Sequence, residues 1–174
     1  MHARIAEEDD EPLLRMTNRF KNSIGIRHLV CGSCNGCEHE MSALTNAVYD
    51  ITQVGWDIVA SPRHADIISV TGPMTQAMRP AARATREAAA QPCVVVAIGD
   101  CAAGEGPWAG APYAGAGAGI ELQAVVTVRG CPPTPQMIKA GLLRAVQTLD
   151  APPGARDALV PSAESEPVTV ESVP

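Results

Sequence analysis

Three separated segments of this chain share one pattern, in which an apolar, β-branched run is followed within a few residues by a cysteine. The pattern occurs before Cys31, Cys101 and Cys131. In a parallel sheet the carboxyl ends of the strands lie along one edge, so cysteines that are far apart in sequence can meet there. The pattern therefore predicts an α/β fold whose sheet gathers thiols at that edge.

Strands and helices are expected to alternate along the chain. Compact apolar runs predict strands at 24–30, 57–60, 67–71, 93–98 and 124–128. Apolar residues at helical spacing predict helices at 38–49, 75–90 and 135–149. Thr134 suits the N-cap of the last helix, and Pro80 predicts a kink or a late start in the second. This order favours a mostly parallel sheet with helices on both faces, joined by right-handed crossovers.

The chain of 174 residues is long enough for one domain with a proper core. We expect a charged N-terminal arm at 1–22, an α/β domain at 23–149 and a disordered tail at 150–174, where Pro and Glu dominate. The stretch 102–119 alternates Gly with Ala and Pro, which predicts a long loop within the domain.

Composition excludes several classes of protein. Thirteen basic and nineteen acidic side chains give a net charge of −6, and aromatic residues make up only 3%, so we expect no nucleic-acid partner. The first ten residues are charged and contain no apolar signal core, which predicts a cytoplasmic protein with reduced thiols. No apolar run approaches the ~20 residues needed to cross a bilayer, so membrane association would come through partners.

Four converging thiolates suit a metal centre, and widely dispersed spacing suits an iron–sulfur cluster better than zinc. Of the six cysteines, Cys101 and Cys131 follow strands and neighbour glycines, which let the backbone approach an inorganic core. Cys93 opens a buried strand and is expected to pack in the core.

The N-terminal loop offers three candidates for the remaining two ligands. The pairs Cys31/Cys34 and Cys34/Cys37 both have the two-residue spacing common in cluster ligation. Position in the loop favours the later pair, because Cys31 adjoins the strand. Two rival interpretations use the same residues: a structural zinc site, and a thioredoxin-like Cys31–Cys34 pair that would leave the downstream cysteines unexplained.

Polar residues near the cysteines have competing roles. His39, at a helix start, would tune the cluster or carry protons, or simply pack against a partner. Glu40 would serve a proton relay or only oppose the helix dipole. Arg63 and His64 follow a predicted strand end, which places them near the cluster edge as cavity-lining residues or as partners of loop carbonyls.

The glycine-rich loop carries two of the five aromatic residues of the chain, Trp108 and Tyr113. Aromatic side chains in an irregular, charge-poor loop are expected to be interface anchors rather than core residues.

Five motifs, in order along the chain, resemble one family. They occupy residues 34–41, 61–68, 71–79, 99–102 and 130–135. This combination resembles the 20 kDa subunit of NADH:quinone oxidoreductase and the small subunits of membrane-bound [NiFe] hydrogenases. The Cys-x-x-Cys-Asn-Gly-Cys form is most similar to the formate hydrogenlyase and CO-induced hydrogenase small subunits, whereas the quinone-reductase subunit carries adjacent cysteines.

The resemblance implies a flavodoxin-like fold and one [4Fe–4S] cluster held by Cys34, Cys37, Cys101 and Cys131, with Cys31 as an extra thiol. The implied function is electron transfer beside the catalytic large subunit of a membrane-associated, hydrogenase-type complex. A ferredoxin-like iron–sulfur subunit and membrane-arm subunits are the other implied partners, with docking on the cytoplasmic side of the membrane. The alternatives are a quinone-reducing 20 kDa-type subunit and a zinc-stabilised structural subunit.

Two positions depart from the family pattern. The Gly-Gly-aromatic segment that follows the third cysteine in the family is replaced here by residues 103–110, which include Glu105. Arg129 stands where the family usually has Pro before Gly-Cys. Both departures lie close to a predicted ligand, so they are expected to alter the surface around the cluster.

Overall fold

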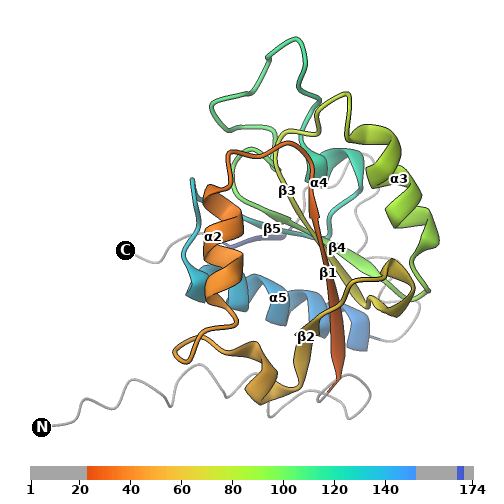
Figure 1. Cartoon of the computed structure of the whole chain (residues 1–174), viewed down its shortest axis with the longest axis vertical. Coiled ribbons are helices and arrows are strands. Elements are labelled where there is room, and N and C mark those ends of the chain that lie inside the picture. Colours follow the sequence, from red (N-terminus) through yellow and green to blue (C-terminus); the bar gives the residue numbers. More distant parts are fainter. Residues whose placement is uncertain (1–22, 152–167, 171–174) are drawn as a thin grey trace, which may run out of the picture.

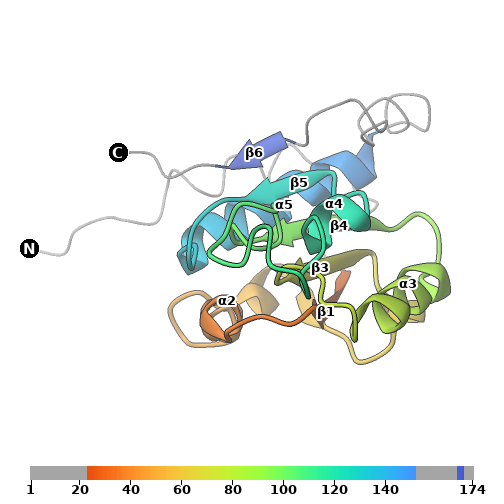
Figure 2. The ribbon, with the colours of Figure 1, turned by 90° about the horizontal axis from the view of Figure 1, so that it is seen from above.

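A single parallel sheet organises the molecule in the computed structural model, which describes residues 23–151 and 168–170. The strands lie in the order β2-β1-β3-β4-β5-β6, and each neighbouring pair is parallel (Figures 1 and 2). They are β1 Ile24–Val30, β2 Trp56–Ile58, β3 Ile67–Thr71, β4 Val94–Ile98, β5 Val126–Val128 and β6 Val168–Val170. The order of the first five is that of flavodoxin-like sheets. The predicted α/β, flavodoxin-like fold class is confirmed.

Helices cover both faces of this sheet, as Figure 2 shows from above. They are α2 Gly36–Ala43, α3 Arg79–Ala88, α4 Ala118–Glu121 and α5 Pro135–Asp150. Helices α2 and α5 contact each other and lie on one face, and α3 and α4 lie on the other. Two short 3-10 segments, Ile51–Val54 and Pro62–His64, flank β2.

The two central strands explain the two-sided core. Every residue of β3 and β4 is buried, as expected for strands covered on both faces. Val96 and Ile98 pack in the cluster that contains α5, whereas Val95 and Ala97 pack with residues of α3 and α4. Successive β4 side chains therefore serve opposite cores, which accounts for the continuous apolar run in the sequence.

The helix predicted at 38–49 is shorter in the structure and begins earlier, as α2. Its end has a local cause: the Asn46 side chain accepts hydrogen bonds from the Val48 and Tyr49 amides at 2.9 and 3.0 Å. Such side-chain bonds compete with helical ones. Val48, expected on the apolar face, is 77% exposed.

Other boundaries follow the sequence more closely. Helix α3 begins late, with Pro80 in its first turn, and Thr134 caps α5 by accepting a hydrogen bond from the Met137 amide. The short strand β6 lies inside the predicted tail, 150–174, most of which is outside the described residues. The predicted arm at 1–22 also lies outside them.

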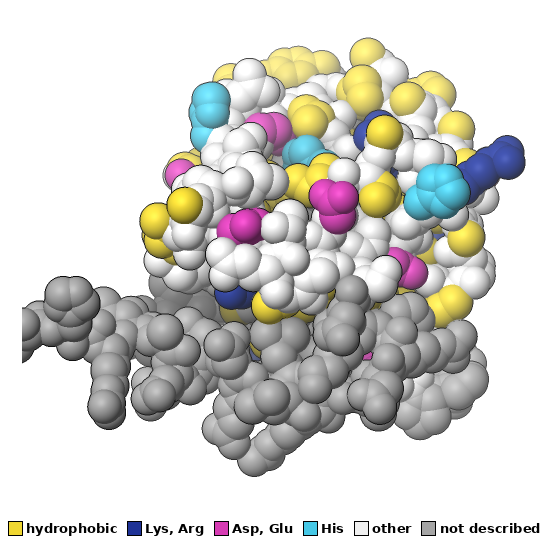
Figure 3. All heavy atoms as spheres, turned by 60° about the horizontal axis from the view of Figure 1, so that its bottom comes forward, with side chains coloured by type: hydrophobic (Ala, Val, Ile, Leu, Met, Phe, Trp, Pro, Cys, Tyr) yellow, Lys and Arg dark blue, Asp and Glu magenta, His cyan; other side chains and the backbone are white. Residues whose placement is uncertain are grey.

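The described surface mixes charge types without a broad basic area on the face drawn in Figure 3. Acidic and apolar side chains are interspersed there, and basic ones are few and separate. Among the described residues, no helix is both long enough and apolar enough to span a bilayer.

Candidate metal centre

The carboxyl edge of the sheet gathers three cysteine-bearing segments, as the sequence predicted. Cys31 directly follows β1, Cys101 comes three residues after the end of β4, and Cys131 comes three residues after the end of β5. The strand order reverses between β1 and β3, the position where flavodoxin-like folds place their ligands. The loop from Cys31 to Cys37 leaves the sheet at this point.

Four of the six thiols influence one another electrostatically. Burial is the largest cause that raises the pKa of Cys37 to about 12, and Glu38, Cys101, Cys131 and Cys34 contribute to this rise. Burial also raises the pKa of Cys101, again with contributions from Cys131 and Cys34. Thiols raise each other's pKa only at close range, so Cys34, Cys101 and Cys131 all lie near Cys37. A metal cation would offset the mutual repulsion of their thiolates.

The other two cysteines lie elsewhere. Cys31 and Cys93 are buried in the core cluster on the α3 and α4 side of the sheet. Burial raises the pKa of Cys31 to about 12, with a smaller contribution from Glu121, and burial raises the pKa of Cys93 to about 11. The six cysteines thus divide into four that lie near one another and two that pack in the core.

Because the two core cysteines lie outside the proposed metal centre, we expect their replacement to affect the stability of the fold and not the binding of iron. Replacing Cys31 or Cys93 by Ala should leave bound iron unchanged and lower the free energy of unfolding by about 1 kcal/mol, because each change removes a buried sulfur and leaves a small void. Iron analysis and urea unfolding of the metal-free chain measure the two effects. Loss of iron in the Cys31 variant would assign that thiol to the site instead.

Two glycines leave room for the ligand sulfurs. Gly99, with φ +87°, lies against Cys37, and a Cβ at this position would come within 2.5 Å of the Cys37 sulfur. Gly106 packs in the same way against the sulfur and backbone of Cys101. A side chain at either position would occupy space that the thiol uses.

A polar network ties the cysteine loop to the sheet. The Glu38 carboxylate accepts hydrogen bonds from the hydroxyls of Ser33 and Thr71, and His28 Nε2 lies 3.8 Å from it. Burial tends to raise the pKa of Glu38, but the hydrogen bonds from Ser33 and Thr71 outweigh it, so the pKa lies below its ordinary value. Sequence reasoning missed this network. Its signal was a hydroxyl residue, Thr71, ending an apolar strand beside the loop.

The donor set fits an iron–sulfur cluster in its chemistry. Four thiols at one edge match the four ligands that a [4Fe–4S] cluster needs, one for each iron. Among the described residues, no three His, Cys, Asp or Glu side chains converge closely enough to share a single ion. Cluster ligands instead surround a volume, because each binds a different iron.

The remaining polar candidates are not all near the thiols. His39 is exposed and Glu40 half-buried on α2, directly after the cysteine loop. The prediction that Arg63 and His64 lie near the cluster edge is wrong. The His64 backbone packs against Gly25, the second residue of β1, at the amino end of the sheet. The reason is that β2 has only three residues, pairs with the first half of β1, and ends far from the carboxyl edge.

The two aromatic residues of the glycine-rich loop are not core residues. Trp108 is 41% exposed and Tyr113 is 51% exposed, and their rings contact each other with centroids 6.4 Å apart. The loop is held to the segment before α3 by a bridge between Thr75 and Ala114. The loop that carries the exposed Trp108 and Tyr113 rings is therefore anchored to the rest of the domain beside Cys101.

These features define a flavodoxin-like α/β protein with a four-cysteine site at the carboxyl edge of its sheet. Residues 34–145 match the family described as NADH ubiquinone oxidoreductase, 20 Kd subunit. The chain belongs to this family, which confirms the resemblance inferred from the motifs.

Relatives in the family are components of hydrogenases and of NADH-quinone oxidoreductases. The chain is 38% identical to "Probable membrane-bound hydrogenase subunit mbhJ" of Pyrococcus furiosus, over 71% of this chain and 74% of that one. It is 33% identical to formate hydrogenlyase subunit 7 of Escherichia coli, over 78% of this chain but only 53% of the relative. It is 37% identical to a subunit of the NADH-quinone oxidoreductase of Clostridium beijerinckii, over 62% of this chain and 64% of the relative.

A solved structure supports the same fold. A chain of the membrane-bound sulfane sulfur reductase, an archaeal respiratory membrane complex, matches with a TM-score of 0.64 and 28% identity. The match covers 75% of this chain and 72% of that chain.

Proposed function

We propose that this protein is an electron-transfer subunit that holds one [4Fe–4S] cluster beside the catalytic large subunit of a membrane-associated, hydrogenase-type complex. The observation that carries the proposal is the proximity of four thiols at the carboxyl edge of the sheet, where Cys34, Cys101 and Cys131 all contribute to the raised pKa of Cys37. The proposed ligands are Cys34, Cys37, Cys101 and Cys131.

The hydrogenase branch is favoured over the quinone branch by the cysteine loop itself. Cys34 and Cys37 are separated by two residues, as in the hydrogenase-type small subunits that the sequence resembles, whereas the quinone-reductase subunit carries adjacent cysteines. Relatives from both branches match the chain, so the large subunit decides between the acceptors. A partner with a complete set of nickel-binding cysteines would place the chain in a hydrogenase.

The residues of this chain would set the environment of the cluster. When bound, such a cluster takes up and releases one electron at a time, at a potential set by charge, hydrogen bonds to sulfur and exposure. The Trp108 amide donates a hydrogen bond to the Cys101 sulfur, and Glu38 places a fixed negative charge next to Cys37. The hydrogen bond from Trp108 favours the reduced state of the cluster, and the negative charge of Glu38 opposes it.

Partners and location follow from the same proposal. The exposed pair Trp108 and Tyr113 supplies a rigid aromatic surface near Cys101, suited to contact a partner subunit. We infer that the partners are a hydrogenase-type large subunit, a ferredoxin-like iron–sulfur subunit and membrane-arm subunits. The protein would then be peripheral on the cytoplasmic side of the membrane.

Anaerobic purification of the full chain, reconstituted with iron and sulfide if needed, tests the proposal. We expect a brown protein with about four irons per chain, which gives an electron paramagnetic resonance signal after reduction with dithionite. The zinc alternative predicts a colourless protein with one zinc and no such signal. Stoichiometric zinc in place of iron, after anaerobic reconstitution, would contradict the proposed function.

A further inference from the structure

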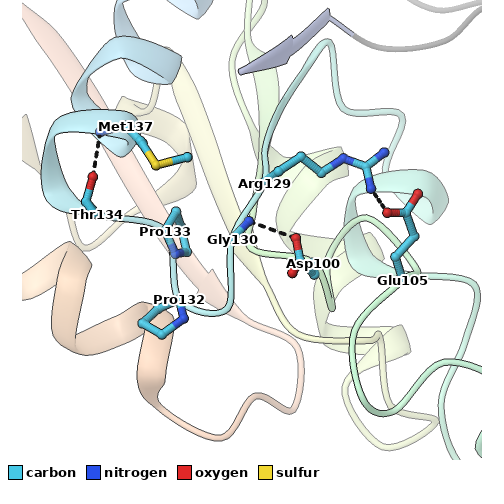
Figure 4. Close-up of a pocket in the computed structure, with 8 residues that line it drawn as sticks. All are labelled: Asp100, Glu105, Arg129, Gly130, Pro132, Pro133, Thr134 and Met137. Carbon is cyan, nitrogen blue, oxygen red and sulfur yellow. Dashed lines mark hydrogen bonds and ion pairs between the residues drawn. The ribbon is translucent and has the colours of Figure 1, made fainter. Parts of the chain in front are cut away.

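The two positions that depart from the family pattern contact each other. Arg129, which stands where Pro is usual, forms an ion pair with Glu105, which belongs to the replaced segment (Figure 4). Arg129 lies two residues before Cys131, and Glu105 lies four residues after Cys101. The ion pair therefore connects two loops that each carry a proposed ligand.

Glu105 begins a turn that wraps around Cys101. The amides of Glu105 and Gly106 donate to the Asp100 carbonyl at 2.9 and 3.1 Å, and Gly106 packs on the Cys101 sulfur. At the end of this turn the Trp108 amide donates a hydrogen bond to the same sulfur. Any motion of the Glu105 side of the turn would thus disturb a hydrogen bond to a proposed ligand.

The base of the two loops is already joined through Asp100. Its Oδ1 accepts from the Gly130 amide at 2.7 Å, and its own amide donates to the Gly130 carbonyl at 3.0 Å. These bonds fix the loops where they leave the sheet, but they do not hold the turn that follows. In Figure 4 the Arg129 side chain reaches across to Glu105 beyond this base.

On the basis of the proposed function, we propose that Glu105 and Arg129 are positioning residues that fasten the turn at 105–108 to the Cys131 loop and keep the Trp108 amide on the Cys101 sulfur. Hydrogen bonds to cluster sulfurs favour the reduced state. The pair therefore raises the reduction potential of the cluster. Glu105 is 60% exposed and Arg129 is 30% exposed, and such pairs add little to global stability, so the effect is local.

The test uses variants that keep the net charge constant. Glu105→Gln with Arg129→Gln removes the pair, and the charge swap Glu105→Arg with Arg129→Glu rebuilds it in reverse. In the reconstituted full chain, the reduced-to-oxidised ratio at a fixed potential should fall about threefold or more in the double Gln variant, ~28 mV for one electron. The charge swap should return it toward the wild-type value. Redox titration followed by electron paramagnetic resonance measures both.

A matched control carries the same substitutions on the exposed surface of α3, Arg83→Gln with Glu87→Gln, and should leave the potential unchanged. Amide hydrogen exchange gives a second readout that does not need the cluster. Exchange across 105–108 should accelerate in the double Gln variant and slow again in the swap.

The outcomes separate the inference from the proposed function. A wild-type chain that binds no iron contradicts the proposed function, whereas hydrogen exchange still tests the fastening of the turn. An iron-loaded double Gln variant with the wild-type potential overturns the inference alone. A charge-swap variant whose reduction potential stays as low as that of the double Gln variant also overturns the inference, because restoring the ion pair would then not restore the potential.

Discussion

Replacing Cys101 by Ala is expected to abolish the cluster, with at least a tenfold loss of bound iron relative to the wild-type chain after identical anaerobic reconstitution. One iron of the [4Fe–4S] core would lose its thiolate, and Cys31 and Cys93 are both buried in the core cluster on the α3 and α4 side of the sheet, so we expect neither to replace it. Iron and sulfide analysis, with the visible spectrum, measures the effect.

The fold of this variant should survive, which makes the loss of iron interpretable. Cys101 is only partly buried, so the metal-free variant should unfold at a urea concentration close to that of the metal-free wild type. Cys93→Ala is the matched control: it removes the same type of side chain and should keep its iron. Retention of full iron by the Cys101 variant would remove that residue from the ligand set.

The strand pattern was readable from the sequence because it has a local cause. Strands β1 and β3 have the predicted boundaries, since each is rich in β-branched or other apolar residues and ends where Cys31 or Gly72 begins the following loop. The cysteines at the carboxyl edge followed from parallel pairing alone. The start of helix α5 was also predictable from local signals, because Thr134 caps the helix and Pro135 lies in its first turn.

Features that depend on pairing between distant segments were not readable. Arg63 and His64 were misplaced because sequence does not show that β2 pairs with only the first half of β1. The contacts of Glu38 with Thr71, and of Glu105 with Arg129, join segments whose spatial relation appears only in the folded chain. The sequence motifs were enough to predict the four thiols, whereas the residues that surround the thiols could be identified only in the folded structure.

Gly99 offers the sharpest test of the geometry around the thiols. Replacing Gly99 by Ala should prevent cluster assembly, with bound iron reduced at least tenfold, because the new Cβ would come within 2.5 Å of the Cys37 sulfur. In the metal-free chain the Cys37 side chain can rotate away, so folding should survive. Once Cys37 has to bind iron, that rotation is no longer available. Iron content after reconstitution and urea unfolding of the metal-free variant measure the two effects separately.

Gly110 supplies the control for backbone strain. It has φ +76°, close to the +87° of Gly99, but a Cβ there would meet nothing within 4 Å. Gly110→Ala should therefore show only the conformational cost of a left-handed residue, about 1–2 kcal/mol at most, and keep its iron. The same cost in unfolding free energy for both variants, with iron lost only from Gly99→Ala, would assign the loss to the collision with Cys37. Equal iron in both would show that the Cys37 sulfur does not lie against Gly99 when iron is bound, and would contradict the proposed geometry of the centre.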